Sequence, residues 1–223
     1  MIQGTNIAKD YFINNRRRLK VFDKINFKIE ENEKVGFLGL NGSGKSTICK
    51  IISQAEPISS GELVVSSSIS WPIGIYNCLK ESLTADENIK FISIAYGIDS
   101  KKISDQIEHY AELKGFMSNP IKTYSAGMRA KLAFFIAFSI EFDFYICDEI
   151  TSVGDVSFRK KAQEFFDTIV KDKGLILCSH NSENIKKNVD KVYVVYNGKL
   201  SEKLEVNEGL SFYEEIRLNK NEK

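Results

Sequence analysis

The segment "KVGFLGLNGSGKSTICKIISQ", Lys34–Gln54, decides the fold of this chain. Its first residues form a short apolar run typical of a buried strand, and its last residues place apolar side chains at helical spacing. Between them, "GLNGSGKS" matches the pattern G-x-x-x-x-G-K-[ST]. A glycine-rich turn could match this pattern by chance, but the strand before it and the helix after it favour a loop that holds phosphate groups.

Each residue type in this loop suits a triphosphate. Gly39, Gly42 and Gly44 allow the backbone to curl so that N–H groups point inward at phosphate oxygens. Lys45 is expected to reach the β- and γ-phosphates, which makes it a candidate catalytic residue, and Ser46 is expected to offer its hydroxyl to Mg²⁺. The nucleotide-binding residues predicted here are Gly39, Leu40, Asn41, Gly42, Ser43, Gly44, Lys45, Ser46 and Thr47.

The bulk properties exclude several classes of protein. The chain has 223 residues, of which 43% are hydrophobic and 27% are charged, as in an ordinary globular domain. The formal net charge of +1 gives no support to nucleic acid as a partner. The longest apolar run, Leu132–Ile140, is about half the roughly 20 residues that span a bilayer. The N-terminus lacks the pattern of a secretion signal, so a soluble protein is expected.

The cysteines and histidines argue against a zinc site or a disulfide framework. The four cysteines, Cys49, Cys78, Cys147 and Cys178, show no CxxC spacing, and the chain has only two histidines. We expect the cysteines to be small buried residues.

The pattern along the chain predicts an α/β fold. Two strand-like runs, Ile2–Ala8 and Val21–Ile29, flank Arg16–Arg18, which are expected on a solvated hairpin; steering of nucleotide or anionic lipid is the alternative. The segment from Asp86 to Ile140 is helical in pattern, and beyond it strands and helices alternate up to a final amphipathic helix. This alternation predicts a largely parallel sheet covered on both faces, with residues 86–140 as a helical insertion into one domain of residues 1–223.

Further polar residues follow the apolar strands. "FYICDE" places Asp148 and Glu149 at the end of one strand, and "GLILCSH" places His180 at the end of another. Strand ends beside a phosphate loop are where ligands bind in parallel sheets. Asp148 suits the Mg²⁺ shell, Glu149 suits the general base that activates water, and His180 is placed to sense the γ-phosphate. A buried structural role is the alternative for the histidine.

A second candidate anion site lies in "TYSAGMRAKLAFF", Thr123–Phe135. Small residues there run into a predicted helix, and free N–H groups at a helix start attract anions. The two sites lie far apart in the sequence, which raises the question of why one small chain needs both.

The order of these motifs resembles an ABC ATPase cassette. The phosphate loop, a helical insertion, "YSAGM", "FYICDE", "SVGD" and the strand-end histidine follow one another as in that family. The resemblance implies an ABC-type nucleotide-binding domain with a mostly parallel core sheet, an antiparallel N-terminal part and an inserted helical subdomain. It implies that Tyr11 stacks on adenine, that Tyr124–Met128 form the signature motif, and that Ser152–Asp155 cross the dimer interface.

The resemblance also answers the question of the second anion site. In this family two cassettes form a head-to-tail homodimer, and the signature motif of one contacts the ATP held by the other. By that analogy Ser125, Ala126 and Gly127 bind the partner's nucleotide, and ATP with Mg²⁺ is the cofactor pair.

A narrower resemblance concerns the exported substrate. "SWPIG", "KTYSAGMRAKLAF" and "CDEITSVGD" look like ATP-binding subunits of capsular polysaccharide exporters, with O-antigen or teichoic acid exporters as alternatives. This implies an ATPase on the cytoplasmic face of the inner membrane that energises a separate integral membrane permease. A lipid-linked polysaccharide would be transported without binding this chain directly. Lys80 falls where the family expects a glutamine, which is a departure from its pattern.

Two other classes remain as alternatives. A soluble ABC protein of DNA repair or translation usually carries tandem cassettes or a long coiled coil, and this chain shows neither. A nucleotide-gated regulatory module with little or no hydrolysis is disfavoured by Glu149 and His180, while Lys80 leaves some room for it.

Overall fold

The computed structural model describes residues 1–13, 17–74, 79–148 and 156–221. The chain forms two compact units, and each is described by itself. The core unit comprises Met1–Pro72, Asp143–Glu149 and Asp172–Lys223. The helical unit comprises Ile73–Phe142 and Ile150–Lys171.

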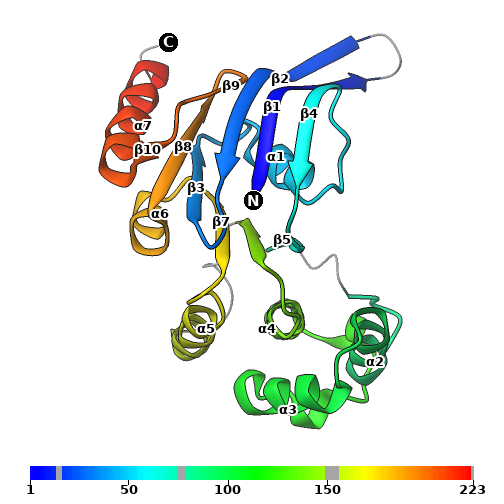
Figure 1. The fold of residues 1–223 in the computed structure, drawn as a ribbon. Helices are drawn as coiled ribbons and strands as arrows, with labels where there is room; N and C mark the ends of the chain where they lie inside the picture. The colour runs from blue at the N-terminus through cyan, green and yellow to red at the C-terminus, as the bar shows by residue number, and fades with distance from the viewer. Residues whose placement is uncertain (14–16, 75–78, 149–155, 222–223) are drawn as a thin grey trace. The chain divides into compact units, whose positions relative to one another are not determined.

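Two sheets shape the core unit (Figure 1). The smaller sheet is antiparallel, with the order β2-β1-β4, and the larger has the order β10-β8-β3-β7-β6-β5 with β9 on β8. In the larger sheet β3 lies parallel to β7 and β8, and β6 lies parallel to β7. The strands are β1 (Ile2–Ile13), β2 (Arg17–Ile29), β3 (Lys34–Gly39), β4 (Ser60–Val65), β5 (Ile69–Ile73), β6 (Phe144–Asp148), β7 (Gly174–Ser179), β8 (Lys191–Tyr196), β9 (Lys199–Leu200) and β10 (Leu204–Glu205). The predicted α/β class, with a mostly parallel sheet and an antiparallel N-terminal part, is confirmed.

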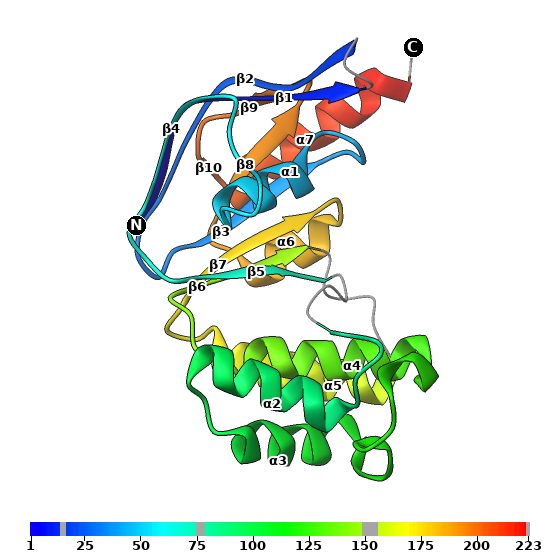
Figure 2. The same ribbon diagram turned by 90° about the vertical axis from the view of Figure 1, so that its right-hand side faces the viewer.

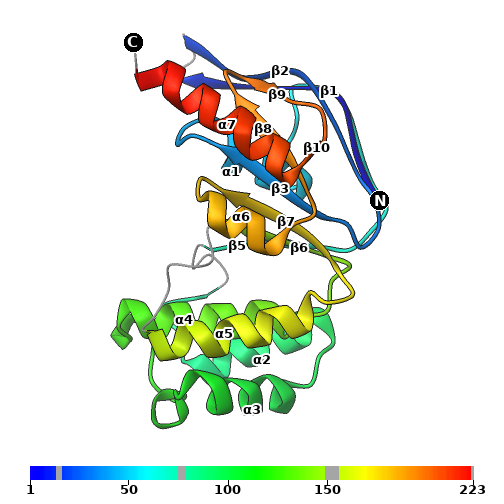
Figure 3. The same ribbon diagram turned by 90° about the vertical axis from the view of Figure 1, so that its left-hand side faces the viewer.

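Helices cover both faces of the larger sheet within the core unit. Helix α1 (Lys45–Ile52) lies on one face (Figure 2), and α6 (Ser182–Asn188) and α7 (Val206–Asn221) lie on the other (Figure 3). Side chains alternate along β8 accordingly, because successive residues of a strand point to opposite faces. Tyr193 and Val195 belong to the cluster around α1, whereas a Cβ added at Gly209 of α7 would lie 2.0 Å from Val192.

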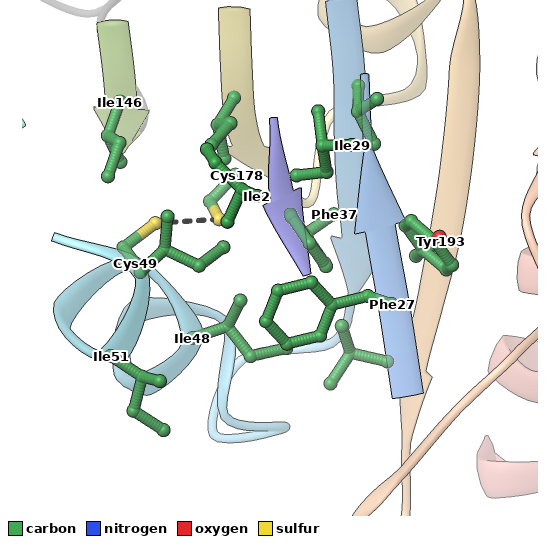
Figure 4. Close-up of a cluster of buried hydrophobic side chains, with 14 of the residues drawn as sticks. Ile2, Phe27, Ile29, Phe37, Ile48, Cys49, Ile51, Ile146, Cys178 and Tyr193 are labelled. Atoms are coloured by element: carbon green, nitrogen blue, oxygen red, sulfur yellow. Dashed lines mark hydrogen bonds between the residues drawn. The ribbon is translucent and has the colours of Figure 1, made fainter. Parts of the chain in front are cut away.

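The buried cluster around α1 joins the two sheets (Figure 4). Ile48, Cys49 and Ile51 of α1 pack there with residues from β1, β2, β3, β6, β7 and β8, so the helix that follows the phosphate loop rests on an apolar base. The sulfurs of Cys49 and Cys178 lie 2.8 Å apart. Cys49, Cys147 and Cys178 are buried free thiols, as predicted, and burial raises the pKa of Cys147 and Cys178. Cys78 lies outside the described residues.

The helical unit is held together by aromatic side chains. Its helices are α2 (Ala85–Tyr96), α3 (Ser100–Ala111), α4 (Ala126–Phe138) and α5 (Val156–Ile169), with short 3-10 helices η1 (Lys114–Phe116) and η2 (Ile121–Thr123). The Tyr110 ring of α3 stacks on Phe135 of α4 with centroids 5.6 Å apart. The ring centroid of Phe165 in α5 lies 5.2 Å from the centroid of each of these rings. Helix α5 therefore belongs to the helical unit. The alternation of strands and helices in the sequence had predicted that it packs with the core.

The first two strands extend further than their apolar patterns predicted. Strands β1 and β2 remain paired out to Tyr11 opposite Leu19 and Phe12 opposite Arg18. Arg18 is exposed, but its guanidinium donates a hydrogen bond of 2.6 Å to Oδ2 of the buried Asp10 and lowers the pKa of that carboxyl. The additional residue pairs between β1 and β2 thus keep Arg18 close to Asp10. Arg16 lies outside the described residues.

Candidate nucleotide-binding site

The phosphate loop connects β3, which ends at Gly39, to α1, which begins at Lys45. Gly42 and Gly44 have φ of 78° and 108°, a region that favours glycine. A Cβ at Gly44 would lie 2.5 Å from the ring of Phe22, and a Cβ at Gly39 would lie 2.6 Å from the carbonyl oxygen of Val195. The packing inside the core unit therefore requires glycine at Gly39 and Gly44.

Lys45 points into the loop from the first turn of α1. The side chain is buried, and its ammonium donates hydrogen bonds of 2.7 Å to the Gly39 carbonyl and 3.0 Å to the Leu40 carbonyl. A lysine ammonium has three donor hydrogens, so two fix its position and one is available for a further acceptor. This arrangement places a positive charge at the loop that the sequence predicted to bind phosphate.

Two observations test whether a triphosphate fits the loop. The Ser43 hydroxyl oxygen is buried and has no partner among the described residues, which is the state of a polar group built for a ligand. The N-cap residue of α1, Gly44, supplies no side-chain hydrogen bond to the first turn, so the N–H groups there remain available to an anion. The loop therefore fits the chemistry of phosphate oxygens.

Ser46 and Asp148 meet beside the loop. The Ser46 hydroxyl donates a hydrogen bond of 2.8 Å to Oδ2 of Asp148, at the end of β6. Mg²⁺ prefers oxygen ligands and commonly binds through one or two protein oxygens together with phosphates and water. These two residues fit that donor set. Among the residues that the structure describes, no group of three or more His, Cys, Asp or Glu side chains forms a self-sufficient metal site.

The strand register gathers the predicted strand-end residues at one edge of the sheet. Leu38 pairs with Ser179 and Asp148 pairs with Cys178, so the ends of β3, β6 and β7 lie level. His180 follows β7 directly and is exposed, and its carbonyl accepts a hydrogen bond of 3.4 Å from Tyr213. Glu149 and Ser152–Asp155 lie outside the described residues, so their predicted roles remain predictions.

Tyr11 lies on β1 in the same unit as the loop. The side chain is half-buried, and the ammonium of Lys9 lies 4.7 Å from the centroid of its ring. The sequence pattern indicated Tyr11 but not Lys9, although the two residues share one face of the strand by alternation. Several arginines and lysines lie close by in the sequence, and nothing in that pattern shows that Lys9 is buried.

The predicted signature motif begins α4, in the helical unit. Ser125 is the N-cap, and its hydroxyl oxygen accepts a hydrogen bond of 3.1 Å from the Met128 N–H. Tyr124 before it is buried, which raises the pKa of its phenol, and donates a hydrogen bond of 2.6 Å to the Phe116 carbonyl. Among the described residues, a Cβ at Gly127 would meet only the Ser125 Oγ, at 3.9 Å. The packing of this part of the chain therefore does not require glycine there.

The Lys80 segment, residues 80–84, is fixed by a residue that sequence analysis missed. The Asn88 side chain is buried, accepts a hydrogen bond from the Lys80 N–H and donates one to the Thr84 carbonyl, at 2.7 and 2.8 Å. Because an asparagine amide both donates and accepts, one side chain can close this loop. The Lys80 residue itself is exposed.

The Lys80 segment is also tied to the turn before the signature helix. The Leu83 carbonyl accepts a hydrogen bond from the Ile121 N–H, and the Glu81 carbonyl accepts one from the Lys122 N–H, each 2.9 Å long. Two segments nearly forty residues apart thus share backbone hydrogen bonds next to Ser125.

Within the part of the chain that the structure describes, we find no helix with the length and apolar character of a membrane span.

Comparison with known families places the chain among nucleotide-binding cassettes. Residues 22–152, more than half of the chain, match the ABC transporter family. The ATP-binding protein BexA of Haemophilus influenzae is 37% identical over 97% of this chain and 100% of its own length. The capsule polysaccharide export ATP-binding protein CtrD of Neisseria meningitidis is 36% identical over 97% of this chain and 100% of its own length.

A longer relative matches only in part. The teichoic acids export ATP-binding protein TagH of Shouchella clausii is 35% identical over 86% of this chain, which corresponds to 54% of TagH. Among solved structures, a dimeric ATP-binding cassette bound to ADP and Pi in a post-hydrolysis state has a TM-score of 0.79 at 19% identity, over 92% of this chain and 99% of its own. At that identity the likeness concerns the fold. On the family match and the two full-length relatives, the chain belongs to the ABC transporter family as an ABC-type ATPase.

Proposed function

We propose that this chain is the ATP-hydrolysing subunit of an exporter that moves capsular polysaccharide across the inner membrane through a separate permease. The observation that carries the proposal is the likeness to CtrD, which extends over nearly the whole chain and the whole of that relative. The chain then acts as one ATPase domain of residues 1–223 at the cytoplasmic face, with the helical segment inserted into the core. The lipid-linked polysaccharide passes through the permease and is not bound by this subunit.

The core unit binds and orients ATP. Lys45, already fixed by two loop carbonyls, directs its ammonium to the β- and γ-phosphates, and the loop N–H groups surround their oxygens. Ser46 and Asp148 hold Mg²⁺, which when bound offsets the charge of the phosphates. Tyr11 stacks on the adenine ring.

Hydrolysis uses the residues at the strand ends. Glu149 accepts a proton from the attacking water, a contribution worth roughly 10² to 10⁴ in rate. His180 contacts the γ-phosphate and responds to its presence. This role is supported by the strands that precede them in the sequence, since β6 and β7 end level with β3 at the edge of the sheet where the loop lies.

The helical unit completes the site of a second copy. Among the described residues, a Cβ at Gly127 would meet only the Ser125 Oγ, at 3.9 Å. Ser125 is exposed and caps α4 through its hydroxyl oxygen, so its O–H is available to donate to a ligand. In a head-to-tail homodimer, Ser125, Ala126 and Gly127 close over the γ-phosphate held by the partner. ATP binding then joins the two copies, and hydrolysis separates them.

A teichoic acid exporter is the second candidate. The chain spans 54% of the TagH protein of Shouchella clausii but 86% of the TagH protein of Staphylococcus epidermidis, which is 33% identical over 94% of this chain. The higher identity to CtrD, 36% over the whole of that relative, favours the capsule type.

One experiment tests hydrolysis and dimerisation together. The Glu149→Gln variant should bind ATP, form a stable dimer and turn over at least about 10²-fold more slowly, since the base is lost while the binding groups remain. Size-exclusion chromatography with light scattering and phosphate release measure both. A monomer at saturating ATP and Mg²⁺, with the membrane permease supplied in nanodiscs, would contradict the proposal.

A mixing experiment tests the composite site. Lys45→Ala and Ser125→Arg homodimers should each fail to trap nucleotide, because every site lacks one half. The mixed dimer keeps one intact site and should trap up to half of the wild-type amount. If mixing restores nothing while circular dichroism shows both variants folded, the two motifs act within one chain.

A third experiment tests the assignment to transport. An affinity-tagged chain expressed at native level should co-purify with a polytopic membrane protein, identified by mass spectrometry. Recovery of ribosomes or DNA-repair proteins instead would support the soluble class of ABC ATPases.

A further inference from the structure

Lys9 places a buried positive charge behind the ring of Tyr11. The residue is 5% exposed, and its ammonium lies 4.7 Å from the Tyr11 centroid. Cations within about 6 Å of a ring centroid are attracted by the negative face of the ring. Among the described residues of the core unit, Lys9 and Tyr11 form the one cation–π contact.

The ammonium is fixed by a segment that follows α1. It donates hydrogen bonds of 2.6 Å to Oε1 of Glu56 and 2.7 Å to the Pro57 carbonyl. Two residues further on, the Ser59 hydroxyl oxygen accepts a hydrogen bond of 3.0 Å from the Asp10 N–H. The segment after the phosphate-loop helix thus holds β1, and Lys9 with it, immediately before Tyr11.

Stability alone gives a poor reason for this arrangement. A buried ion pair costs desolvation energy, and replacing such a pair with well-packed apolar residues is often neutral or stabilising. Lys9 and Glu56 have side chains that are 6% and 25% exposed, so they belong to this costly class. A function for the charge is the better account.

The position of the charge indicates that function. The Tyr11 side chain is half-buried, and the ammonium of the buried Lys9 lies over one face of its ring, so a ligand ring that stacks on Tyr11 must use the opposite face. A cation on one face draws π-electron density toward it, which makes the other face a better partner for an electron-rich ring. Purines are such rings.

We propose that Lys9 is a positioning residue for nucleobase recognition: its ammonium fixes the Tyr11 ring and polarises it for stacking on a purine. The inference rests on the proposed role of Tyr11 in binding adenine and adds a source for base preference. Glu56 and the Pro57 carbonyl hold the cation in register with the ring.

The test compares ligands with and without a purine. Isothermal titration with ATP, CTP and inorganic tripolyphosphate, each with Mg²⁺, separates the base from the phosphates. Lys9→Met should weaken ATP binding about 3- to 10-fold, because the Tyr11 ring is then neither fixed nor polarised for stacking, and should leave tripolyphosphate binding unchanged. Lys9→Arg should restore most of the ATP affinity, and the preference for ATP over CTP should fall with Lys9→Met.

Controls keep the outcome decisive. Lys28→Met removes a lysine of β2, the strand paired with β1, that forms an ion pair with Glu30, and it should change none of the three affinities. If Lys9→Met fails to fold, Glu56→Gln loosens the cation without removing it and should weaken ATP binding alone. In the Tyr11→Ala background, Lys9→Met should cause no further loss, because its effect acts through the ring.

The outcomes also separate this inference from the function on which it rests. A uniform loss for all three ligands, or no loss for any, overturns the role of Lys9. If Tyr11→Ala leaves ATP binding intact, the adenine role of Tyr11 fails instead. If wild type binds neither ATP nor tripolyphosphate, the proposed function itself fails.

Discussion

The phosphate loop and the signature helix are both glycine-containing helix starts, yet they need their glycines for different reasons. At Gly39 and Gly44 an added Cβ would lie 2.5 to 2.6 Å from atoms of the same unit. At Gly127 the nearest such atom is 3.9 Å away, at ordinary contact distance. Packing inside the core unit explains the glycines of the loop, whereas packing among the described residues gives no reason for glycine at position 127.

The two helix starts also differ in how their N–H groups are used. Gly44 supplies no side-chain cap to α1, which leaves the first turn open to an anion. Ser125 caps α4 with its own hydroxyl oxygen, so that helix is already satisfied in part. The first turn of α1 therefore has N–H groups available to a ligand, whereas the first turn of α4 is stabilised by its own cap.

The largest effect is expected at the centre of the loop. Lys45→Ala removes a charged donor from the phosphates, and charge-assisted hydrogen bonds contribute about 1.5–3 kcal/mol each, so ATP affinity should fall about 100-fold. Fluorescent nucleotide titration measures the change. Lys50→Ala, an exposed lysine of the same helix, is the matched control and should bind ATP as wild type. Equal losses in both variants would show that the helix, not the ammonium, matters.

The next effect concerns the glycine that packing requires. Gly44→Ala places a Cβ against Phe22 at a φ of 108°, which strains the backbone and should lower the free energy of unfolding by at least about 2 kcal/mol. For a chain of this size that corresponds to a loss of about 4–8 °C in Tm, measured by calorimetry. An unchanged Tm would contradict the conclusion that packing against Phe22 requires glycine at position 44.

A smaller and opposite effect is expected at the signature helix. Gly127→Ala should raise the free energy of unfolding by up to about 1 kcal/mol, because alanine has the higher helix propensity and the site is open. ATPase turnover should nevertheless fall about 10-fold, because the added methyl group would destabilise the closed dimer interface by about 1.4 kcal/mol. Gly115→Ala, also open and in the same unit, should leave turnover unchanged. Normal turnover in Gly127→Ala would break the comparison.

The smallest effect is a difference in acid sensitivity between the units. The carboxyls with a lowered pKa among the described residues are Asp10, held by Arg18, Glu30, held by Lys28, and Asp143, which accepts hydrogen bonds from Ser68; all lie in the core unit. A lowered folded pKa gives stability that is present above the ordinary pKa of about 4 and lost as the pH falls through the folded pKa. The core unit should therefore weaken first in acid.

Two signals can follow this difference. The single tryptophan, Trp71, reports on the core unit. Circular dichroism reports on all the helices, and those of the helical unit, α2 to α5, contribute more helical residues than those of the core unit. As the pH falls below about 4, the urea midpoint by fluorescence should fall more than the midpoint by circular dichroism. Asp143→Asn should reduce the gap. Midpoints that fall together would contradict the prediction.

The core of the fold could be predicted because its signals are local. The run of Lys34–Gln54 shows strand, glycine loop and helix in order, and Asp148 and His180 follow apolar strands. Parallel register then brings strand ends to one edge whatever the loops between them do. For this reason Ser46 and Asp148, more than a hundred residues apart, meet as expected.

The features that the sequence did not predict are the packing of α5 and the burial of two polar residues, and both depend on partners distant in the sequence. The apolar face of α5 could have covered a sheet, but Phe158 and Phe165 pack with the aromatic residues of α3 and α4. Lys9 and Asn88 are polar residues whose burial depends on partners distant in sequence, Glu56 and the Lys80 segment. No periodicity in one sequence distinguishes them from exposed polar residues.

The hydrogen bonds between the Lys80 segment and residues 121–122 have a mechanical consequence. A force on Glu81 or Leu83 must either break two backbone hydrogen bonds or move the turn that precedes Ser125. Because Asn88 closes the same segment onto α2, the displaced part behaves as a small rigid block. A push delivered at one end of that block reaches the start of α4 as a change of position, with no need for the helix to unwind.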